Sequence, residues 1–552
     1  MARSFDCSRF SLIKLVMAKL EVEMREYEIF PTRIILQNGV ENAERCLEEK
    51  YSSVVFRNTE TTVLRNDGGE NAYLLLDFGK ELQGGVRIIT QNVKPNGIAN
   101  VRFTFGESVG EALSSIGEKG ATNEHSPRDF VYPVSFMLDN VIGQTGFRFL
   151  KIELMGENAM LEISSVSAIL NIQSVEVGSF SSNDALLDKI VETAIYTLHL
   201  NLQNGMMWDG IKRDRAVWSG DTNPEILSLM YFFGNVPNIK NTLRFLRKSN
   251  PKGMWIEGIS SYSMWWIINV CNYVLQSDDF LFCAEMRIEV LQELLRFESC
   301  YEENGKANFA KASSWEWCFL DWPTSESEDA ETGVANLMLY ALEKVRMAFH
   351  SDKEILDICE KIRKKAMRCT YPEPQYKQVM AMQTLVFGAS ERAKEFLESG
   401  GAKGLSTFMG YYILKALSIC NSEKTLDILK EYYGGMLQKG ATTFWEDFDI
   451  AWMENSGRID EITPIEKKDV HGDFGRFCYQ GYRHSLCHGW SCGVLAFLVE
   501  EVIGLKYDKE TRAFTANPKP YGLKKFTVNL HTPRGKVRVC FDGINTECKT
   551  VK

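Results

Sequence analysis

The sequence has little of what marks several large protein classes. Its 14 cysteines form no Cys-x-x-Cys pair and no regular framework, a usage typical of reduced, mostly buried thiols in a cytoplasmic protein. No run approaches the roughly 18 apolar residues that a membrane-spanning helix needs. The phosphate-binding patterns Gly-x-x-x-x-Gly-Lys-Ser/Thr and Gly-x-Gly-x-x-Gly are also absent, so we expect no nucleotide cofactor.

Basic character is scarce as well. The net charge is −10, which argues against a nucleic acid or a membrane surface as partner, because both require a basic face. The apolar run near the N-terminus is short and is interrupted by Lys14, so we expect no signal peptide. These observations predict a cytoplasmic protein of ordinary globular composition, and they set no oligomeric state.

The first third of the chain has the pattern of strands. Alternating apolar residues in 101–108 and 148–156 have the period of half-buried strands. The segment 71–90 has two apolar runs around a glycine-containing stretch, which we interpret as two strands joined by a turn. Several short strands with glycine-rich connections favour an antiparallel β-sandwich. We assign residues 1–178 to N-terminal strands and this sandwich.

The pattern changes to helical spacing near residue 183. Ser182 or Asn183 can cap the first helix, and helical runs continue to about residue 505, for example in 334–350 and 410–421. We assign 179–508 to one helical domain, as a closed toroid of paired helices or a solenoid. Alternating residues near 526–530 and 537–541 predict a hairpin in a small C-terminal β unit, 509–552. The predicted class is therefore multidomain α+β.

Tryptophan is missing from both β regions. All 11 tryptophans lie between residues 208 and 490. Indole rings make good platforms for the apolar face of a sugar, and carboxylates accept hydrogen bonds from its hydroxyl groups. The alternative is that these rings only fill the core of a large helical domain.

The segment WDGIKRDRAVWSGD, 208–221, combines three carboxylates with three cations and two tryptophans. Asp209, Asp214 and Asp221 can face one cavity with Arg213 between them. Paired carboxylates shift each other's pKa, so that one is protonated while another stays ionised. The alternative is a solvated charge run with helix-capping aspartates.

The segment GATTFWEDFDIAW, 440–452, places Glu446, Asp447 and Asp449 among aromatic residues. Apolar neighbours raise the pKa of a carboxyl group, which makes it a usable base near neutral pH. The alternative is an exposed acidic helix start.

A third segment, 471–493, carries three of the seven histidines. His484 and His488 have a spacing that can bind zinc on a helix, but Gly489 follows directly and the pattern lacks the acidic residue of a zinc protease motif. We therefore expect a hydrogen-bonding role for these histidines, and no metal.

Together, DGIKRDRAVWSGD, GATTFWEDFD and HSLCHGWSCG resemble motifs of α-L-rhamnosidases of glycoside hydrolase family 78, within the six-hairpin glycosidases. The similarity is closest to a short subgroup without accessory domains. LLLDFGKELQGGVRI and VRFTFGES resemble the sandwich that precedes the catalytic domain, and FLDWP and STFMGYYILKAL resemble barrel segments.

The resemblance implies an (α/α)6 barrel and an inverting exo-glycosidase that removes terminal α-L-rhamnose from glycans or plant glycosides. It places the general acid at Asp214 and the general base at Glu446. The acid is usually Glu in this family, so Asp214 is one methylene shorter. The resemblance further implies substrate contacts for Asp209, Arg213, Trp218, Asp221, Trp445 and His488.

Two alternatives remain open. In the first, the chain is an enzyme of this fold that acts on another deoxysugar or on a uronic acid. In the second, it is a carbohydrate-binding protein with weakened catalysis. For a uronic acid, Lys212 and Arg213 are the candidate partners of the substrate carboxylate.

Overall fold

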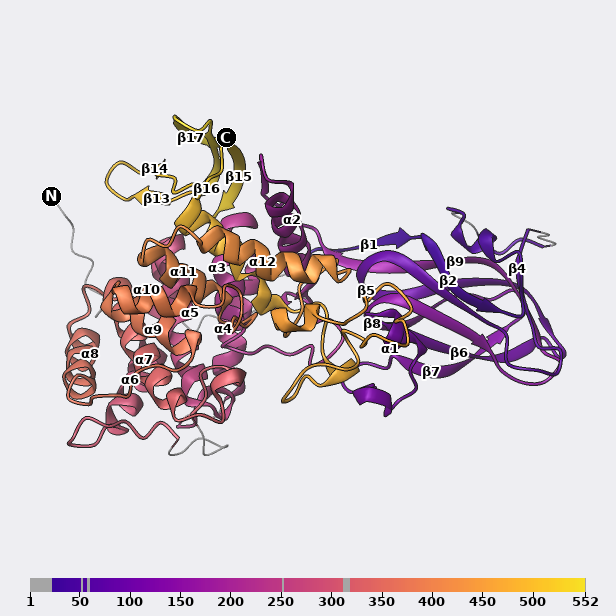
Figure 1. The fold of residues 1–552 in the computed structure, drawn as a ribbon, viewed down its shortest axis with the longest axis horizontal. Helices are drawn as coiled ribbons and strands as arrows, with labels where there is room; N and C mark the ends of the chain where they lie inside the picture. Colours follow the sequence, from indigo (N-terminus) through magenta and orange to yellow (C-terminus); the bar gives the residue numbers. More distant parts are fainter. Residues whose placement is uncertain (1–21, 51–52, 57–59, 251–252, 311–317, 552) are drawn as a thin grey trace.

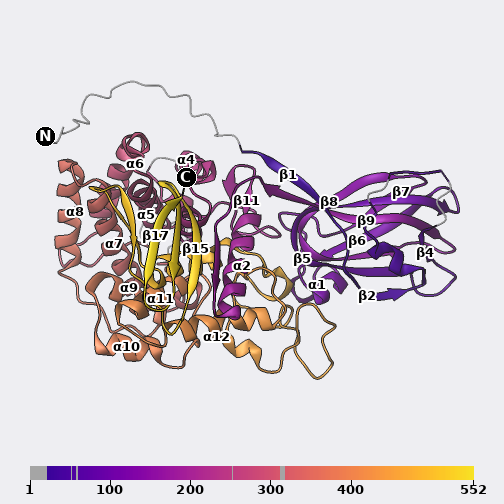
Figure 2. The ribbon, with the colours of Figure 1, turned by 90° about the horizontal axis from the view of Figure 1, so that it is seen from above.

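The computed structural model describes residues 22–50, 53–56, 60–250, 253–310 and 318–551. The molecule is elongated, with a strand-rich part at one end and a helical part at the other (Figure 1). The N-terminal segment with its short apolar run lies outside the described residues. The C-terminal strands lie against the helical part when the molecule is seen from above (Figure 2). The chain is therefore α+β, as predicted.

The strand-rich part is an antiparallel sheet of nine strands in the order β3-β4-β9-β5-β8-β6-β7, with β1 added on β9 and β2 on β5. The strands are β1 (Met24–Ile29), β2 (Arg33–Asn38), β3 (Val40–Glu41), β4 (Thr62–Arg65), β5 (Tyr73–Lys94), β6 (Ile98–Gly106), β7 (Asp129–Ser135), β8 (Asp139–Leu154) and β9 (Met160–Gln173). The predicted strands at 101–108 and 148–156 correspond to β6 and β8.

The interpretation of 71–90 as two strands and a turn is wrong. This segment forms most of the single 22-residue strand β5. Its register with β8 shifts between Asp77 and Leu82 and again between Gly84 and Val86. Gly79 has φ +83°, a left-handed conformation that favours glycine and is typical of a bulge. The glycines therefore bend one strand, which pairs with β2 in its first part and with β9 in its second.

The helical part holds most of the helices that the structure describes. The helices of the chain are α1 (Val109–Leu113), α2 (Ala185–Leu200), α3 (Thr222–Phe232), α4 (Pro237–Ser249), α5 (Ser260–Ser277), α6 (Phe280–Ser299), α7 (Asp329–Ala348), α8 (Lys353–Ala366), α9 (Lys377–Phe387), α10 (Glu391–Glu398), α11 (Gly410–Ile419), α12 (Thr425–Gln438) and α13 (Gly493–Phe497). The predicted helical runs at 334–350 and 410–421 correspond to α7 and α11. Asp184 caps α2 in place of Ser182 or Asn183, because its carboxylate accepts hydrogen bonds from two backbone N–H groups of the first turn.

Six of these helices contact one another in a closed cycle. The contacts run from α3 to α5, α7, α9, α11 and α13, and α13 contacts α3 again. Ring helices are buried almost all round: every residue of α5 from Ser260 to Val274 is buried. Helices outside the ring bury one face, as α8 does with Ile355, Ile358 and Ile362. These contacts favour the toroid over the solenoid, which has two free ends.

The chain returns to strands after the ring. Strands β13 (Leu505–Asp508) and β14 (Ala513–Ala516) form one hairpin, and β15 (Phe526–Thr532), β16 (Gly535–Phe541) and β17 (Thr546–Val551) continue into a second sheet. The predicted hairpin near 526–541 is confirmed by the pairing of β15 with β16. Strand β10 (Ser179–Ser182) also joins this sheet beside β15. Two short strands, β11 (Leu202–Gln203) and β12 (Met206–Met207), form a separate hairpin.

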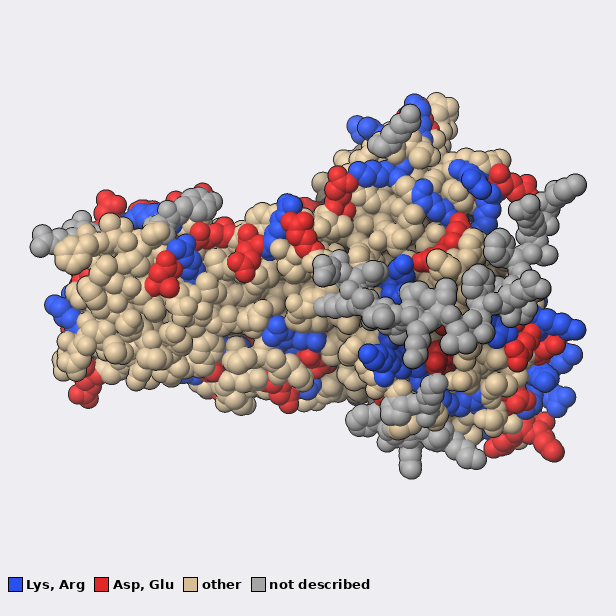
Figure 3. Space-filling view, turned by 180° about the vertical axis from the view of Figure 1, so that it is seen from behind, with Lys and Arg blue, Asp and Glu red and all other residues tan. Residues whose placement is uncertain are grey.

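The surface carries charges of both signs. On the face in Figure 3, basic and acidic side chains are interspersed over the helical part, and much of the strand-rich part is uncharged. Neither sign forms on this face the continuous field that steers a charged macromolecule. Among the described residues, no helix is both long and apolar enough to cross a membrane.

A buried arginine of the strand-rich part connects it to the helical part. Arg148 of β8 donates to both carboxylate oxygens of Asp77 on β5, at 2.8 and 3.0 Å. Its third nitrogen donates to the backbone carbonyl of Gly440 at 3.0 Å, on the helical side. Both side chains are less than a tenth exposed. One guanidinium therefore holds the strand-rich part against the loop that follows α12.

Replacing Arg148 tests this connection. We expect Arg148→Met to destabilise the protein by about 3–5 kcal/mol, because it leaves the Asp77 carboxylate buried with less compensation. Arg346→Met is the matched control: its pair with Glu343 is exposed and should contribute about 0–1 kcal/mol. Denaturant unfolding measures both, and equal losses in the two variants would contradict this account.

Candidate active site

Three segments that are far apart in the sequence meet where the loops of the helical part face the strand-rich part. They are 208–221, 440–452 and 471–493, the segments that the sequence singled out. The backbone joins them directly: the N–H group of Gly489 donates to the carbonyl of Asp209 at 2.7 Å, and the N–H group of Glu446 donates to the carbonyl of Ser485 at 2.9 Å. This junction places the predicted site residues in one region.

Glu446 is buried, and each of its two carboxylate oxygens has a partner. Its side chain forms an ion pair with Arg213, and its second oxygen accepts a hydrogen bond from the backbone N–H of Ser485 at 3.0 Å. Burial by itself raises the pKa of this carboxyl group. The charges of Arg213, His488 and His484, together with the hydrogen bond from Arg213, outweigh burial and lower the pKa to about 2. The expectation that apolar neighbours raise the pKa of Glu446 is therefore wrong. Because the side chain is 3% exposed, an exposed helix start is also wrong for this residue.

Arg213 connects Glu446 to Asp214. One terminal nitrogen of its guanidinium contacts Glu446, the other lies 2.7 Å from Asp214 Oδ1, and its Nε donates to the carbonyl of Arg483 at 2.9 Å. Two carboxylates on one guanidinium fork lie within roughly 8 Å of each other. Asp214 is the more accessible of the two, with 22% of its side chain exposed.

Asp209 and Asp221 are buried rather than solvated. One oxygen of Asp209 accepts hydrogen bonds from two backbone N–H groups, at 2.7 and 3.0 Å, and Asp221 lies 3.1 Å from Nε2 of His488. Asp209 Oδ2 and His488 Nδ1 have no hydrogen-bond partner among the described residues. Burial, reinforced by the neighbouring aspartates, raises the pKa of Asp209 well above its ordinary value. Unpaired buried polar atoms are the atoms that a bound hydroxyl group would satisfy.

The predicted aromatic walls differ in accessibility. Trp218 is partly exposed and packs edge-on against Tyr262, with ring centroids 6.1 Å apart. Trp445 is 1% exposed and packs against Phe448 in the hydrophobic core. Trp218 therefore offers the larger free face. Two other tryptophans of the aromatic group, Trp315 and Trp317, lie outside the described residues.

Three further carboxyl groups lie near these residues: Asp447, which the sequence singled out beside Glu446, and Glu257 and Asp321, to which the sequence analysis gave no role. Burial raises the pKa of Glu257 to about 8 and that of Asp321 to about 6. Burial and the charges of Asp321 and Glu446 raise the pKa of Asp447 to about 8. Such groups stay partly protonated at neutral pH and donate hydrogen bonds. The motif FLDWP contained Asp321, but no spacing in the sequence connects it to Glu446.

The histidines of 471–493 do not form a zinc pair with each other. His484 Nε2 accepts a hydrogen bond from the backbone N–H of Asp447 at 2.8 Å, whereas His488 faces Asp221. Two other groupings could hold a cation, because their ligand atoms lie within 4.8 Å of one another. They are Asp209, Asp221 and His488, and Glu107, Glu111 and His471.

Lys212 already occupies the second of these groupings. Its Nζ lies 3.0 Å from Glu107 and 3.2 Å from Glu111, and it donates to the carbonyl groups of Tyr482 and His484 at 2.9 and 2.6 Å. The amine supplies the positive charge that a metal ion would bring.

Two Gly-x-Ser-x-Gly stretches, around Ser108 and Ser491, could suggest a serine hydrolase. Ser108 lies 2.8 Å from His471 Nδ1, but it is fully buried and also caps α1. Ser491 is fully buried and donates to the carbonyl of Trp445. Neither hydroxyl is accessible to a substrate, so both serines are structural.

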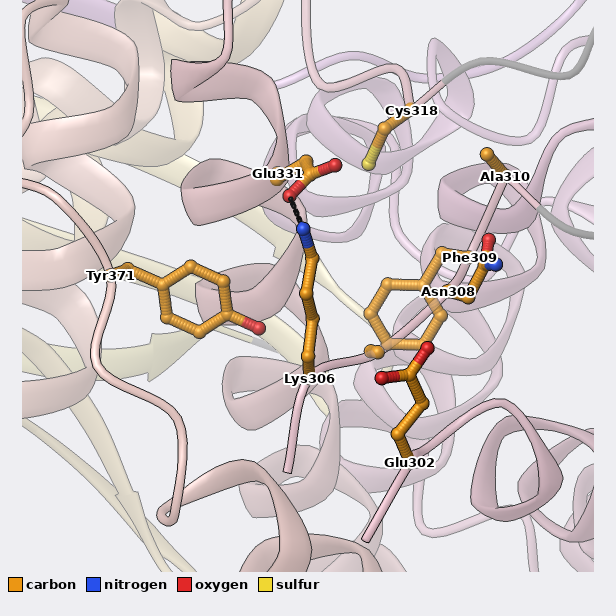
Figure 4. Close-up of a pocket in the computed structure, with 9 residues that line it drawn as sticks. Glu302, Lys306, Asn308, Phe309, Ala310, Cys318, Glu331 and Tyr371 are labelled. Atoms are coloured by element: carbon orange, nitrogen blue, oxygen red, sulfur yellow. Dashed lines mark ion pairs between the residues drawn. The ribbon is translucent and has the colours of Figure 1, made fainter. Parts of the chain in front are cut away.

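A cavity of about 220 Å³ lies elsewhere in the helical part. Figure 4 shows its lining, with Lys306 and Glu331 paired at 3.1 Å. None of the predicted site residues borders it. Asp214 and Glu446 lie at a different place, the junction of the three loop segments.

Among the three site segments, the match to a known protein family includes only 208–221. Residues 175–341 match the family described as the bacterial α-L-rhamnosidase six-hairpin glycosidase domain. No curated protein matches the sequence.

Solved structures match over most of the chain. A family 78 rhamnosidase of Bacillus sp. GL1 is similar with a TM-score of 0.73 and 19% identity, over 92% of this chain and 54% of that one. A rhamnosidase from Klebsiella oxytoca with rhamnose bound has a TM-score of 0.67 and 16% identity, over 87% of this chain and 96% of that one. This chain thus spans about half of the Bacillus protein and nearly all of the Klebsiella one.

A Streptomyces avermitilis α-L-rhamnosidase complexed with L-rhamnose is similar with a TM-score of 0.65 and 15% identity, over 95% of this chain and 48% of that one. At identities of 15–19% the structural likeness shows the fold alone. The match to the family model adds a likeness in sequence over residues 175–341. The chain therefore has the fold of the family 78 α-L-rhamnosidases and matches, at 175–341, the six-hairpin glycosidase domain of bacterial α-L-rhamnosidases.

Proposed function

We propose that this protein is an inverting exo-glycosidase that hydrolyses terminal α-L-rhamnose from glycans or plant glycosides. The observation that carries the proposal is the placement of Asp214 and Glu446 on one guanidinium, that of Arg213. In this proposal the closed cycle of helices is the inner layer of an (α/α)6 barrel, and the strand-rich part is the sandwich that precedes it.

The two carboxyl groups have the properties that inversion requires. The general base must be ionised to take a proton from water, and the low pKa of Glu446 keeps it ionised. The general acid must reach the leaving oxygen, and Asp214 is the more exposed of the pair. Inverting enzymes keep about 6.5–9.5 Å between the two groups, so that a water fits beside the sugar. A separation limited by one guanidinium is compatible with this range.

The remaining predicted residues fit the binding of a neutral sugar. Asp209 and His488 have unpaired polar atoms for its hydroxyl groups, and Asp221 lies beside His488. Protonated Glu257 and Asp447 can donate where the sugar offers an oxygen, and Trp218 offers an aromatic face.

The uronic acid alternative loses both of its candidate cations. Lys212 is buried between Glu107 and Glu111, and Arg213 is taken by Asp214 and Glu446. A substrate carboxylate would then meet buried carboxyl groups without a counter-charge, which is costly. The weakened-catalysis alternative is disfavoured because the proposed acid and base are both present and adjacent.

We also propose that the protein acts in the cytoplasm. Cys46, Cys271, Cys359, Cys487 and Cys492 are buried free thiols, as is usual where thiols stay reduced.

A panel of nitrophenyl glycosides tests the reaction class. We expect the α-L-rhamnoside to be hydrolysed and the uronide to be inert, with the β-anomer of rhamnose appearing first in a proton NMR time course. Glu446→Gln should reduce turnover by about 10²–10⁴-fold, because an amide cannot take a proton from water. Glu454→Gln, an exposed change nearby, is the control. Full activity of Glu446→Gln would leave Glu446 a structural residue.

The ion pair between Glu446 and Arg213 predicts an unusual pH dependence of the activity. The base must be ionised, so activity is lost as the pH falls through the pKa of Glu446, which Arg213 holds near 2. In Arg213→Gln burial is no longer opposed by that charge, so the pKa of Glu446 rises and the acidic limb of kcat/KM should move to higher pH. Arg215→Gln is the neighbouring control. Each protein is incubated at the test pH and reassayed at neutral pH to exclude unfolding, and an unmoved limb would contradict the ion-pair account.

Asp214→Asn tests the acid through the leaving group. A nitrophenolate leaves without a proton, whereas a sugar alkoxide needs one. We therefore expect the variant to lose far more kcat on a rhamnose-containing disaccharide than on the nitrophenyl rhamnoside. Equal losses on both substrates would move the acid role away from Asp214, and Asp209 would be tested next.

A further inference from the structure

Three consecutive residues of the strand-rich part contact the segments 208–221, which carries the proposed acid, and 471–493. They lie in the segment that follows α1 and precedes β7. Glu124 accepts a hydrogen bond from Arg483 at 2.8 Å, and Ser126 donates to the backbone carbonyl of Lys212 at 2.7 Å. Between them, His125 contacts Asp214. The strand-rich part therefore reaches the site with a side chain at each of three successive positions.

His125 contacts both the backbone and the side chain of Asp214. The backbone N–H of Asp214 donates to His125 Nδ1 at 2.9 Å, and the same nitrogen lies 3.4 Å from Asp214 Oδ1. Because Nδ1 is the acceptor, the neutral ring carries its proton on Nε2. The imidazole is therefore used here as a fixed acceptor for the peptide group of Asp214.

Both residues have left-handed backbone conformations. The φ angle is +66° at His125 and +58° at Asp214, and Arg215 follows with +52°. Residues other than glycine rarely adopt this region and keep it only where their surroundings hold them. The hydrogen bond from Asp214 to His125 is the contact that holds the Asp214 peptide from outside its own loop.

We propose that His125 is a positioning residue for Asp214. The inference rests on the proposed role of Asp214 as general acid. A carboxyl group that is one methylene shorter than Glu has less freedom to reach the leaving oxygen through its own torsions. Its reach then depends on the backbone from which it projects, and His125 holds that backbone. Through His125, the strand-rich part therefore contributes directly to the position of the proposed acid.

His125→Ala and His125→Asn separate positioning from mere packing. Alanine removes the acceptor. Asparagine keeps an oxygen at the place of Nδ1 and tolerates the left-handed conformation well. On a rhamnose-containing disaccharide we expect His125→Ala to lose kcat by about 10-fold or more beyond its loss on the nitrophenyl rhamnoside, since small misplacements of a catalytic group are costly. We expect His125→Asn to restore most of that difference.

Glu124→Gln is the matched control on the same segment. It weakens the contact with Arg483 without touching Asp214, so it should change both substrates by the same factor. Thermal unfolding of each variant confirms that it is folded. The proposal is overturned if His125→Ala affects both substrates equally, or if His125→Asn behaves like His125→Ala.

Asp214→Asn, assayed beside these variants, keeps the two proposals apart. If Asp214→Asn discriminates between the leaving groups and His125→Ala does not, the role of His125 is wrong and the acid assignment stands. If Asp214→Asn does not discriminate, the acid assignment itself is wrong, and with it the proposal for His125.

Discussion

The site depends on one buried cation, the guanidinium of Arg213. It touches Asp214 and Glu446 at its two ends and the backbone of Arg483 with its third nitrogen. Its charge is the largest of the influences that lower the pKa of Glu446, whereas burial and like charges raise the pKa of Asp447 beside it. The same ion pair fixes how far apart the two carboxyl groups can lie. In the proposed mechanism, the ionised state of the base and the spacing of the two carboxyl groups thus both depend on one side chain.

Lys212, the neighbour of Arg213, is a second buried cation, and it connects the segments around the site. It lies between Glu107 and Glu111 of the strand-rich part and donates to two carbonyl groups of the segment 471–493. That segment includes Ser485, whose N–H group holds Glu446. The interface between the two parts is therefore charged and hydrogen-bonded, and a charge buried in this way tolerates little displacement. The rigidity of the site comes from this interface as much as from the ring of helices.

The carboxyl groups around Glu446 are differentiated by their surroundings. Glu446 faces a guanidinium and stays ionised, whereas Glu257 and Asp447 face no equal charge and have pKa values near 8. A set of acidic residues thereby supplies both acceptors and donors, which a sugar with several hydroxyl groups requires. Composition does not reveal this division, because every member is the same chemical group.

The sequence by itself determined the local elements and the segments that matter. Alternation predicted β6, β8 and the hairpin of β15 with β16, and helical spacing predicted α7 and α11, because each pattern depends on neighbours a few residues away. The three motifs, with Asp214 and Glu446 among them, also came from the sequence. The bulge at Gly79 could not be predicted from the sequence, because a glycine permits a turn and a bulge equally. Only pairing with the partner strand decides between them. The low pKa of Glu446 and the contact of His125 with Asp214 were decided by the tertiary structure alone, since the residues responsible lie 233 and 89 positions apart in the chain.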